Sequence, residues 1–219
     1  MAFDSILFDL DGTLWDSREA VCASWNAVFR AEGVPLQLTV PYLSAFFGKP
    51  MTQIFAELFP DMPAAAREQL RAACCAQENK DLEHGGARVF DGVREGLERL
   101  RREFELFIVS NCQSGYIETF LRAFSLEALF SGHVSWGDTG LSKGKNNLLI
   151  IEQYALKCPV YVGDAAVDEQ AAAEAGIAFI FARYGFGSVS SYDGAIDSFA
   201  ELAAALPEAE LRFLCRRGY

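Results

Sequence analysis

The chain has 219 residues, 51% of them hydrophobic, and its 30 acidic and 19 basic side chains give a net charge of −11 at pH 7. This is enough apolar material for one large domain or two smaller ones, and it argues against a disordered chain. The acidic balance disfavours a sequence-independent grip on nucleic acid, which needs clustered Lys and Arg, although a local pocket could still bind a small anion.

The N-terminal sequence, the apolar runs and the cysteine pattern indicate the cellular compartment of the protein. The start MAFDSILFDLDG has no basic region ahead of an apolar run, so we expect no secretory signal. No apolar run approaches the roughly 20 residues that cross a bilayer, so we expect no membrane partner. The six cysteines show no CxxC pair and no regular spacing. Together these features predict a cytoplasmic protein.

The first predicted element is a buried strand, SILFDL, at residues 5–10. Asp9 and Asp11 come at its end and point the same way if strand geometry persists, because side chains alternate along a strand. Gly12 and Thr13 follow at once and are typical of a turn. Two adjacent carboxylates repel each other unless a cation lies between them.

From about residue 16 to residue 86 the sequence shows helical patterns and no convincing strand. The helical stretches are REAVCASWNAVFRAEG, MTQIFAELF and AAAREQLRAACCAQENKDL, and proline-containing loops separate them. Gly85 and Gly86 form a plausible hinge. We therefore expect an all-helical domain over residues 16–86, inserted into an α/β domain of residues 1–15 and 87–219. Trp15 precedes the insert, so it either lines a substrate pocket or belongs to the core.

Beyond the insert, short apolar strands alternate with amphipathic helices. The expected strands are ELFIVSN, GHVSW, PVYVGD and IAFIFA, and the expected helices lie around residues 92–103, 114–124, 145–156, 166–175 and 198–206. Such alternation favours a mainly parallel sheet covered by helices. The predicted fold class is α/β, with a Rossmann-like core, a mainly parallel sheet and the inserted helical domain.

Polar side chains collect where these strands end, which is where parallel sheets bind ligands. The set comprises Asp9, Asp11, Ser110, Asn111, Asp164 and Asp168, with Lys143 and Lys145 nearby in GLSKGKNN. Carboxylate oxygens suit Mg²⁺, whereas a hydroxyl, a lysine and the backbone N–H groups around Gly12 and Thr13 suit phosphoryl oxygens. One Asp can attack phosphorus while a second exchanges a proton with the leaving group. The pattern therefore indicates phosphoryl chemistry around a cation.

The segments DLDGTLWDS, VSN, the lysine of LSKGKN and VGDAAVD resemble, in order and setting, the four motifs of the haloacid dehalogenase-like hydrolase superfamily. The resemblance covers essentially the whole chain. The helical insert looks like the small cap of the phosphoglycolate phosphatase and β-phosphoglucomutase-like branch. The resemblance implies an enzyme, a Mg²⁺-dependent phosphoric monoester hydrolase whose partner is a small phosphorylated metabolite. We expect a monomer or a homodimer.

Roles at the first two motifs follow from the resemblance residue by residue. It makes Asp9 the nucleophile and a metal ligand. It makes Asp11 the general acid/base, which binds the metal through its backbone carbonyl. Ser110 would hydrogen-bond the phosphoryl oxygens, with Asn111 assisting.

The last two motifs are carried over in the same way. Asp164 would be a metal ligand, and Asp168 would bind the metal directly or support a group that does. Lys143 is assigned to the phosphoryl group because it lies just before the helix. The family usually has a Pro soon after this lysine, and KGKNN has none, so Lys145 remains a competitor. Lys49, in FGKPMT where this branch has its specificity loop, either reaches a second anionic group of the substrate or is an ordinary solvated lysine.

Three functions remain open. The first is a phosphatase acting through an aspartyl phosphate on a phosphoglycolate-like molecule or a sugar phosphate. The second is a β-phosphoglucomutase-type mutase, which must hold a second phosphate in the cap. The loop AFFGKPMT offers only Lys49 for that purpose, which favours the phosphatase. The third is a non-catalytic binding member of the family, and the intact motifs argue against it. A dehalogenase or a phosphonatase would lack an acid at the position of Asp11.

Overall fold

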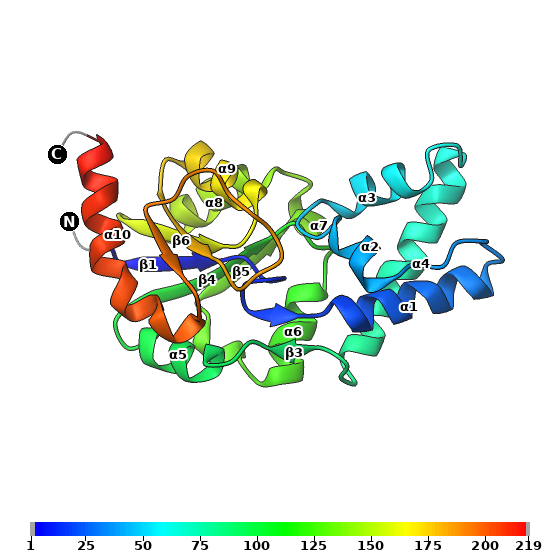
Figure 1. The fold of residues 1–219 in the computed structure, drawn as a ribbon, viewed down its shortest axis with the longest axis horizontal. Helices are drawn as coiled ribbons and strands as arrows, with labels where there is room; N and C mark the ends of the chain where they lie inside the picture. Colours follow the sequence, from blue (N-terminus) through cyan, green and yellow to red (C-terminus); the bar gives the residue numbers. More distant parts are fainter. Residues whose placement is uncertain (1–2, 218–219) are drawn as a thin grey trace.

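The computed structural model describes residues 3–217 and places a twisted sheet next to a helical insert (Figure 1). Within these residues the sheet has six strands in the order β5-β4-β1-β6-β7-β8, and every neighbouring pair is parallel. This confirms the α/β fold class. The strands are β1 (Ser5–Phe8), β4 (Glu105–Ser110), β5 (Gly132–Ser135), β6 (Pro159–Gly163), β7 (Ala178–Ala182) and β8 (Gly194–Ile196).

Helices cover both faces of the sheet, which explains why its central strands are apolar throughout. Ile6 and Phe8 of β1 belong to a hydrophobic cluster shared with α5 (Val93–Leu100), α6 (Tyr116–Phe124) and α10 (Leu202–Arg217). Leu7 points to the opposite face and packs in a second cluster. That cluster includes residues of α8 (Lys143–Gln153) and α9 (Ala166–Ala175).

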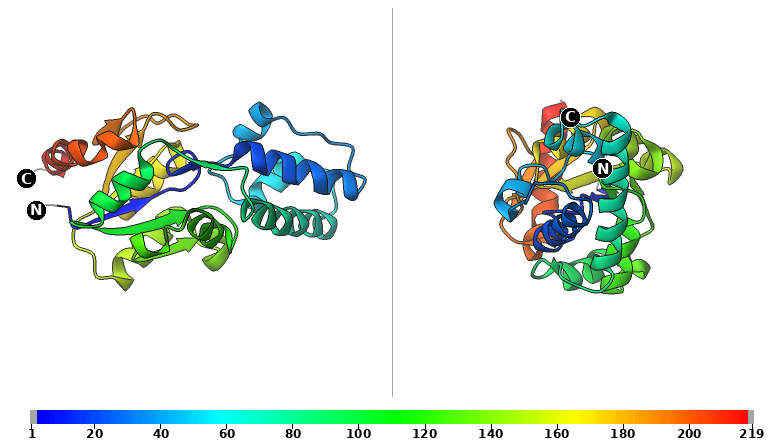
Figure 2. Two further views of the ribbon diagram at one scale, coloured as in Figure 1. Left: turned by 90° about the horizontal axis from the view of Figure 1, so that it is seen from below. Right: turned by 90° about the vertical axis from the view of Figure 1, so that its right-hand side faces the viewer.

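The insert consists of helices over residues 18–82, all of which the structure describes. They are α1 (Arg18–Ala31), α2 (Val40–Ser44), α3 (Met51–Leu58) and α4 (Ala64–Leu82). Figure 2 shows this bundle beyond the end of the sheet, where α1 and α4 run side by side. Trp25, Phe29, Phe55 and Phe59 form its aromatic core. The exact domain limits, 16 and 86, stay a prediction.

A short antiparallel ribbon joins the two parts. It pairs β2 (Trp15–Asp16), just before the insert, with β3 (Arg88–Val89), just after it. The two segments that connect the insert to the sheet domain therefore lie side by side. The sequence did not predict β2, β3 or β8, because strands of two or three residues are too short to show an alternating pattern.

The C-terminal helix corrects another expectation. We expect a helix around residues 198–206, but α10 runs from Leu202 through Pro207 to Arg217. An internal proline costs about 3 kcal/mol. The buried side chains of Leu202, Leu206, Ala209 and Phe213 offset that cost, since their spacing forms one apolar stripe against the sheet. Among the helices of residues 3–217, none combines the length and apolarity that a bilayer crossing requires.

Candidate active site

The centre of the site is a buried lysine between two carboxylates. Asp9 directly follows β1, and its backbone N–H donates to the Val162 carbonyl at 2.9 Å. Lys143 Nζ donates to Asp9 Oδ1 at 2.8 Å and to Asp168 Oδ1 at 2.7 Å. All three side chains are buried. Lys143 is the first residue of α8, whereas Lys145 is exposed, so the structure brings Lys143 and not Lys145 to the carboxylates.

Asp164, which follows β6, is held by backbone N–H groups of the turn after β7 and by a hydroxyl of the turn after β1. Its Oδ2 accepts hydrogen bonds from the N–H groups of Phe186 at 2.7 Å and Gly187 at 3.2 Å. The Thr13 hydroxyl donates to Oδ1 at 3.4 Å. A Cβ on Gly12, whose φ is +85°, would lie 2.5 Å from Asp164 Oδ2. The turn after β1 can therefore approach this carboxylate only because it has glycine there.

The carboxylates fit a hard divalent cation. Asp9, Asp164 and Asp168 each offer an oxygen within 4.8 Å of the others. Burial, and then the charge of Asp168, raises the pKa of Asp9 to about 7 and that of Asp164 to about 8. Burial alone would lower the pKa of Lys143, but Asp168 and Asp9 raise it well above its usual value. Three carboxylates facing one ammonium leave excess negative charge, and oxygen donors of this kind suit Mg²⁺.

The two oxygens of Asp168 are already engaged. Oδ1 accepts from Lys143, and Oδ2 accepts from the backbone N–H groups of Asp164 at 3.1 Å and Ala165 at 3.0 Å. Asp168 thus orients Lys143 and the turn that carries Asp164. Its sequence-predicted role at the metal stays a prediction.

Asp11 lies beside the carboxylate cluster and is held by hydroxyl groups. Ser17 Oγ donates to Asp11 Oδ1 at 2.6 Å, and Tyr116 Oη donates to the same oxygen at 3.0 Å. Burial raises the pKa of Asp11 to about 6, and the hydrogen bonds from Ser17 and Tyr116 oppose that rise. A carboxyl with a pKa near neutrality can both give and take a proton, as a general acid/base must.

Ser110 and Asn111 lie at the end of β4 and face the same cavity as Asp9. Both are buried. Asn111 Nδ2 donates to the carbonyl of Gly48, which lies between α2 and α3 of the insert, at 2.8 Å. Asn111 therefore ties the sheet edge to the insert, in addition to its predicted assistance at the phosphoryl group.

A cavity of about 40 Å³ lies between the sheet edge and the insert. Asp9, Asp11, Ser110 and Asn111 line it from the sheet edge, and mostly apolar residues line it from the insert. Lys49 also lines it, but its Nζ lies 2.6 Å from Glu57 Oε2, so its charge is already paired.

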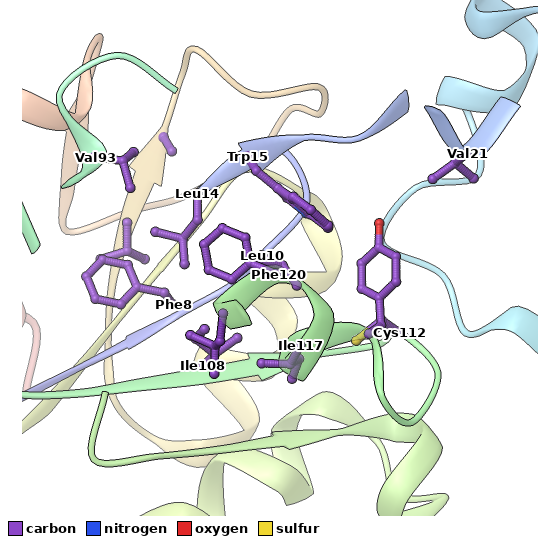
Figure 3. Packing of buried hydrophobic residues seen from close by; sticks show 14 of the residues in the cluster. Phe8, Leu10, Leu14, Trp15, Val21, Val93, Ile108, Cys112, Ile117 and Phe120 are labelled. Carbon is purple, nitrogen blue, oxygen red and sulfur yellow. The ribbon is translucent and has the colours of Figure 1, made fainter. Parts of the chain in front are cut away.

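Trp15 occupies the core. It is completely buried, and Figure 3 shows it among Leu10, Leu14 and Phe120. The Phe120 ring packs against it edge-on, with the centroids 5.1 Å apart. Of the two interpretations of Trp15, the structure supports the core position and gives no support to a substrate contact. The physical reason is the chain reversal after Asp11, which turns this side chain inward toward α6.

Sequence reasoning missed four residues of the site, three of which line the cavity. Glu78 and Gln113 line it, and Tyr116 both lines it and binds Asp11. Phe186 supplies a backbone N–H to Asp164. The only sequence signal for Gln113 and Tyr116 was their closeness to VSN. Glu78 lies in a polar, alanine-rich helix, where a glutamate is ordinarily exposed.

Comparison with known proteins agrees with this geometry. The family model described as haloacid dehalogenase-like hydrolase matches residues 6–182. A phosphoglycolate phosphatase of Xanthomonas campestris pv. campestris is 31% identical, with 83% of this chain and 84% of that protein covered. A 5'-nucleotidase of Pseudomonas aeruginosa is 28% identical over 86% of each chain. Among solved structures, CbbY from Rhodobacter sphaeroides in complex with phosphate superposes with a TM-score of 0.82 and 21% identity, covering 94% of this chain and 99% of that one. This last likeness shows the fold alone.

Proposed function

The chain belongs to the haloacid dehalogenase-like hydrolase family as a phosphoric monoester hydrolase, and on that premise we propose that it cleaves a small phosphomonoester with Mg²⁺ through an aspartyl phosphate. One observation carries this proposal. Lys143 bridges Asp9 and Asp168 in a buried cluster that also contains Asp164, at the edge of the cavity between the sheet and the insert. A structural salt bridge needs no third buried carboxylate.

In the proposed reaction Asp9 attacks phosphorus through a carboxylate oxygen. The Lys143 ammonium, which contacts Asp9 Oδ1, balances negative charge on the phosphoryl oxygens as the bond forms. The Ser110 hydroxyl donates to one of those oxygens. Asp11 protonates the departing alcohol, and it then takes a proton from the water that hydrolyses the aspartyl phosphate.

Asp9, Asp164 and the backbone carbonyl of Asp11 are the groups that would hold Mg²⁺. When bound, the cation would supply charge that favours the ionised form of the nucleophile and the developing charge on phosphorus. Asp168 contributes by holding Lys143 and the Asp164 turn in place.

The insert excludes water from the first step. The Gly48 carbonyl accepts from Asn111. Phe47, also of the α2–α3 loop, packs edge-on against Phe186, with the ring centroids 5.7 Å apart. Since Phe186 also holds Asp164 through its N–H, the loop of the insert is packed on a segment that positions a carboxylate of the site.

The direct test is phosphate release from a panel of phosphomonoesters, with Mg²⁺ and with a chelator. We expect release that depends on Mg²⁺ and favours one group of esters. Isomerisation of β-glucose 1-phosphate without phosphate release would instead identify a mutase. Folded, metal-loaded protein that shows neither reaction would leave the non-catalytic alternative. A cytoplasmic location and a monomeric or dimeric state stay predictions.

Replacing Asp11 by Asn should slow the hydrolysis of alkyl phosphates much more than the cleavage of p-nitrophenyl phosphate. Without the carboxyl proton, alkyl phosphates should lose about 10²- to 10⁴-fold in kcat/KM, the usual contribution of a general acid. With p-nitrophenyl phosphate, whose leaving group needs no proton, first-step chemistry should survive as a burst of nitrophenol. Equal losses for both esters, with no burst, would contradict the assignment of Asp11.

The pH dependence should report the same carboxyl. Because Asp11 has a pKa of about 6 and acts first in its protonated form, activity toward alkyl esters should fall above that pH. The informative quantity is kcat/KM for an alkyl phosphate divided by that for p-nitrophenyl phosphate above about pH 7, where both esters are dianions and the ionisation of Asp9 cancels. We expect this ratio to fall about tenfold per pH unit in that range. A ratio that stays flat from about pH 7 to pH 9 would contradict the role.

A further inference from the structure

A buried glutamate lies in the part of the cavity that the insert covers. Glu78 of α4 is 3% exposed. Trp25 Nε1 of α1 donates to Glu78 Oε2 at 2.5 Å, and Gln113 Nε2 donates to Oε1 at 3.1 Å. Gln113 Nε2 also donates to Asn79 Oδ1 at 3.0 Å. The N–H groups of Trp25 and Gln113 thus already donate to Glu78 and Asn79. Each Glu78 oxygen still has a lone pair that can accept a hydrogen bond from a ligand.

This group faces the same cavity as the proposed nucleophile. Glu78, Trp25 and Gln113 all line it together with Asp9 and Asp11. Most of the remaining wall on the insert side is apolar, formed by residues such as Val21, Leu43, Phe46, Met51 and Ile54. An alcohol that leaves a phosphate at Asp9 therefore meets apolar walls with one acidic acceptor among them.

The charged residues that line the cavity are mostly acidic. Among its described lining residues the acids are Asp9, Asp11 and Glu78, and the single cation is Lys49. Lys49 is paired with Glu57, and its Nζ lies 5.2 Å from the centre of the Phe46 ring. A carboxylate or a second phosphate on the substrate would thus be buried with no free counter-charge, which is strongly unfavourable.

We propose that the Trp25–Glu78–Gln113 cluster is the specificity site for the leaving group, and that it selects an uncharged alcohol carrying a hydroxyl or N–H donor. Sugar and nucleoside monophosphates have such a leaving group. Phosphoglycolate and sugar bisphosphates do not, because their leaving groups carry an additional anion. This inference rests on the proposed function, since it assumes that the phosphate is bound at Asp9.

Above about pH 8, where Glu78 is ionised, hydrogen bonding and charge act in the same direction. A substrate hydroxyl that donates to Glu78 gives this buried carboxylate a further hydrogen bond. Sites of this kind discriminate strongly against ligands that lack the donor, because the buried acceptor is then left without that hydrogen bond. Burial raises the pKa of Glu78 to about 8. Asp11 raises the pKa of Glu78 further, whereas the hydrogen bonds from Trp25 and Gln113 lower it; Glu78 in turn raises the pKa of Cys74 and Cys75 of its own helix and of Tyr116 of α6. Assays at pH 9 would therefore examine the ionised carboxylate.

The test uses pairs of esters that differ only in a terminal CH₂OH or COO⁻ group. Suitable pairs are 2-hydroxyethyl phosphate with 2-phosphoglycolate, glycerol 1-phosphate with 3-phosphoglycerate, and glucitol 6-phosphate with 6-phosphogluconate. We expect the hydroxyl member to have a kcat/KM at least about tenfold higher in the pair whose length spans the cavity. Equal values, or preference for the carboxylate, in every pair would overturn the proposal.

Three variants identify the group responsible. Glu78→Gln keeps the shape but removes the charge and replaces an acceptor with a donor, so it should reduce the preference in that pair about tenfold. Glu68→Gln is the matched control, because Glu68 lies on the exposed part of the same helix and pairs with Arg71. It should leave the preference unchanged. An unchanged preference in Glu78→Gln would overturn the proposal. So would a carboxylate preference that disappears in Lys49→Met, since Lys49 would then be the selecting group.

Binding separates this inference from the proposed function. Calorimetric titration of the Mg²⁺-loaded Asp9→Asn protein with each pair measures selection without turnover, and the hydroxyl member should bind more tightly. If wild-type protein hydrolyses no ester but this binding preference holds, the proposed function fails and the specificity site stands. If hydrolysis occurs and the preference is absent from both binding and kcat/KM, the phosphatase stands and the specificity site is wrong.

Discussion

Replacing Asp9 by asparagine should lower kcat for every phosphate ester at least about 10³-fold and leave the protein folded. The carboxamide is a poor nucleophile, so no covalent intermediate can form, and loss of an attacking group removes stabilisation found only in the transition state. Folding should survive because Asp9 is buried and its pKa is raised to about 7, chiefly by desolvation. The neutral amide is easier to bury than the carboxylate that it replaces.

The measurement is steady-state phosphate release together with a thermal unfolding curve. Mass spectrometry after rapid acid quench should detect a phosphorylated aspartate at residue 9 in the wild-type protein and none in the variant. The assignment of Asp9 as nucleophile would be wrong if sequence-verified Asp9→Asn protein kept steady-state activity within tenfold of wild type. A loss of activity accompanied by unfolding would require repetition with Asp9→Glu, which keeps the charge but displaces the attacking oxygen.

Replacing Lys143 by methionine should damage stability and activity together. The ammonium is the shared partner of Asp9 and Asp168, with donor–acceptor distances of 2.8 and 2.7 Å. Removing one member of a buried ion pair leaves an uncompensated charge and typically costs about 3 to 5 kcal/mol. Activity should fall at least about 100-fold, because the phosphoryl oxygens lose a charged donor in a site that excludes water.

Lys145→Met is the control for this experiment. Lys145 lies two residues further along the same helix and is exposed. Its replacement should change the free energy of unfolding by less than about 0.5 kcal/mol. Denaturant unfolding and phosphate release measured on both variants would decide between the two lysines. Equal effects, or a larger effect at Lys145, would contradict the assignment of Lys143.

The stability loss in Lys143→Met should also depend on pH. The pKa of Asp9 is about 7 and that of Asp164 about 8 in the folded protein, both raised from the ordinary value of 3.8 chiefly by burial. A carboxyl with a raised pKa binds more protons when folded, so its contribution to stability is lost as pH rises through the folded pKa. Without Lys143 this loss should deepen. The difference from wild type should therefore be larger at pH 8 than at pH 5.

The proposed specificity site changes how the named relatives bear on this protein. Relatives called phosphoglycolate phosphatase predict a leaving group that carries a carboxylate. The cavity of this chain instead presents Glu78 and a lysine that is already paired with Glu57. Reaction class follows from the motifs at the strand ends, whereas substrate choice follows from side chains contributed by the insert. The two can diverge between relatives of about 30% identity.

The sequence by itself determined the α/β class, the helical insert and the set of strand-end residues. The reason is local and periodic. Apolar strands separated by amphipathic helices form a parallel sheet, and the carboxyl ends of parallel strands meet at one edge. Asp9, Ser110 and Asp164 could thus be grouped without coordinates. The very short strands and the course of α10 past Pro207 could not be predicted, because pairing and burial outweighed the local signals there.

Only the tertiary structure decided which of several similar side chains are buried and which residues they contact. Lys143 and Lys145 are alike in sequence, but the first turn of α8 lies against Asp9 and Asp168 and buries only Lys143. Trp15 became a core residue because the chain reverses after Asp11. Glu78 looked like a surface glutamate until the packing of α4 against α1 and the segment after β4 enclosed it. These outcomes depend on contacts between residues tens of positions apart, about which a local pattern carries no information.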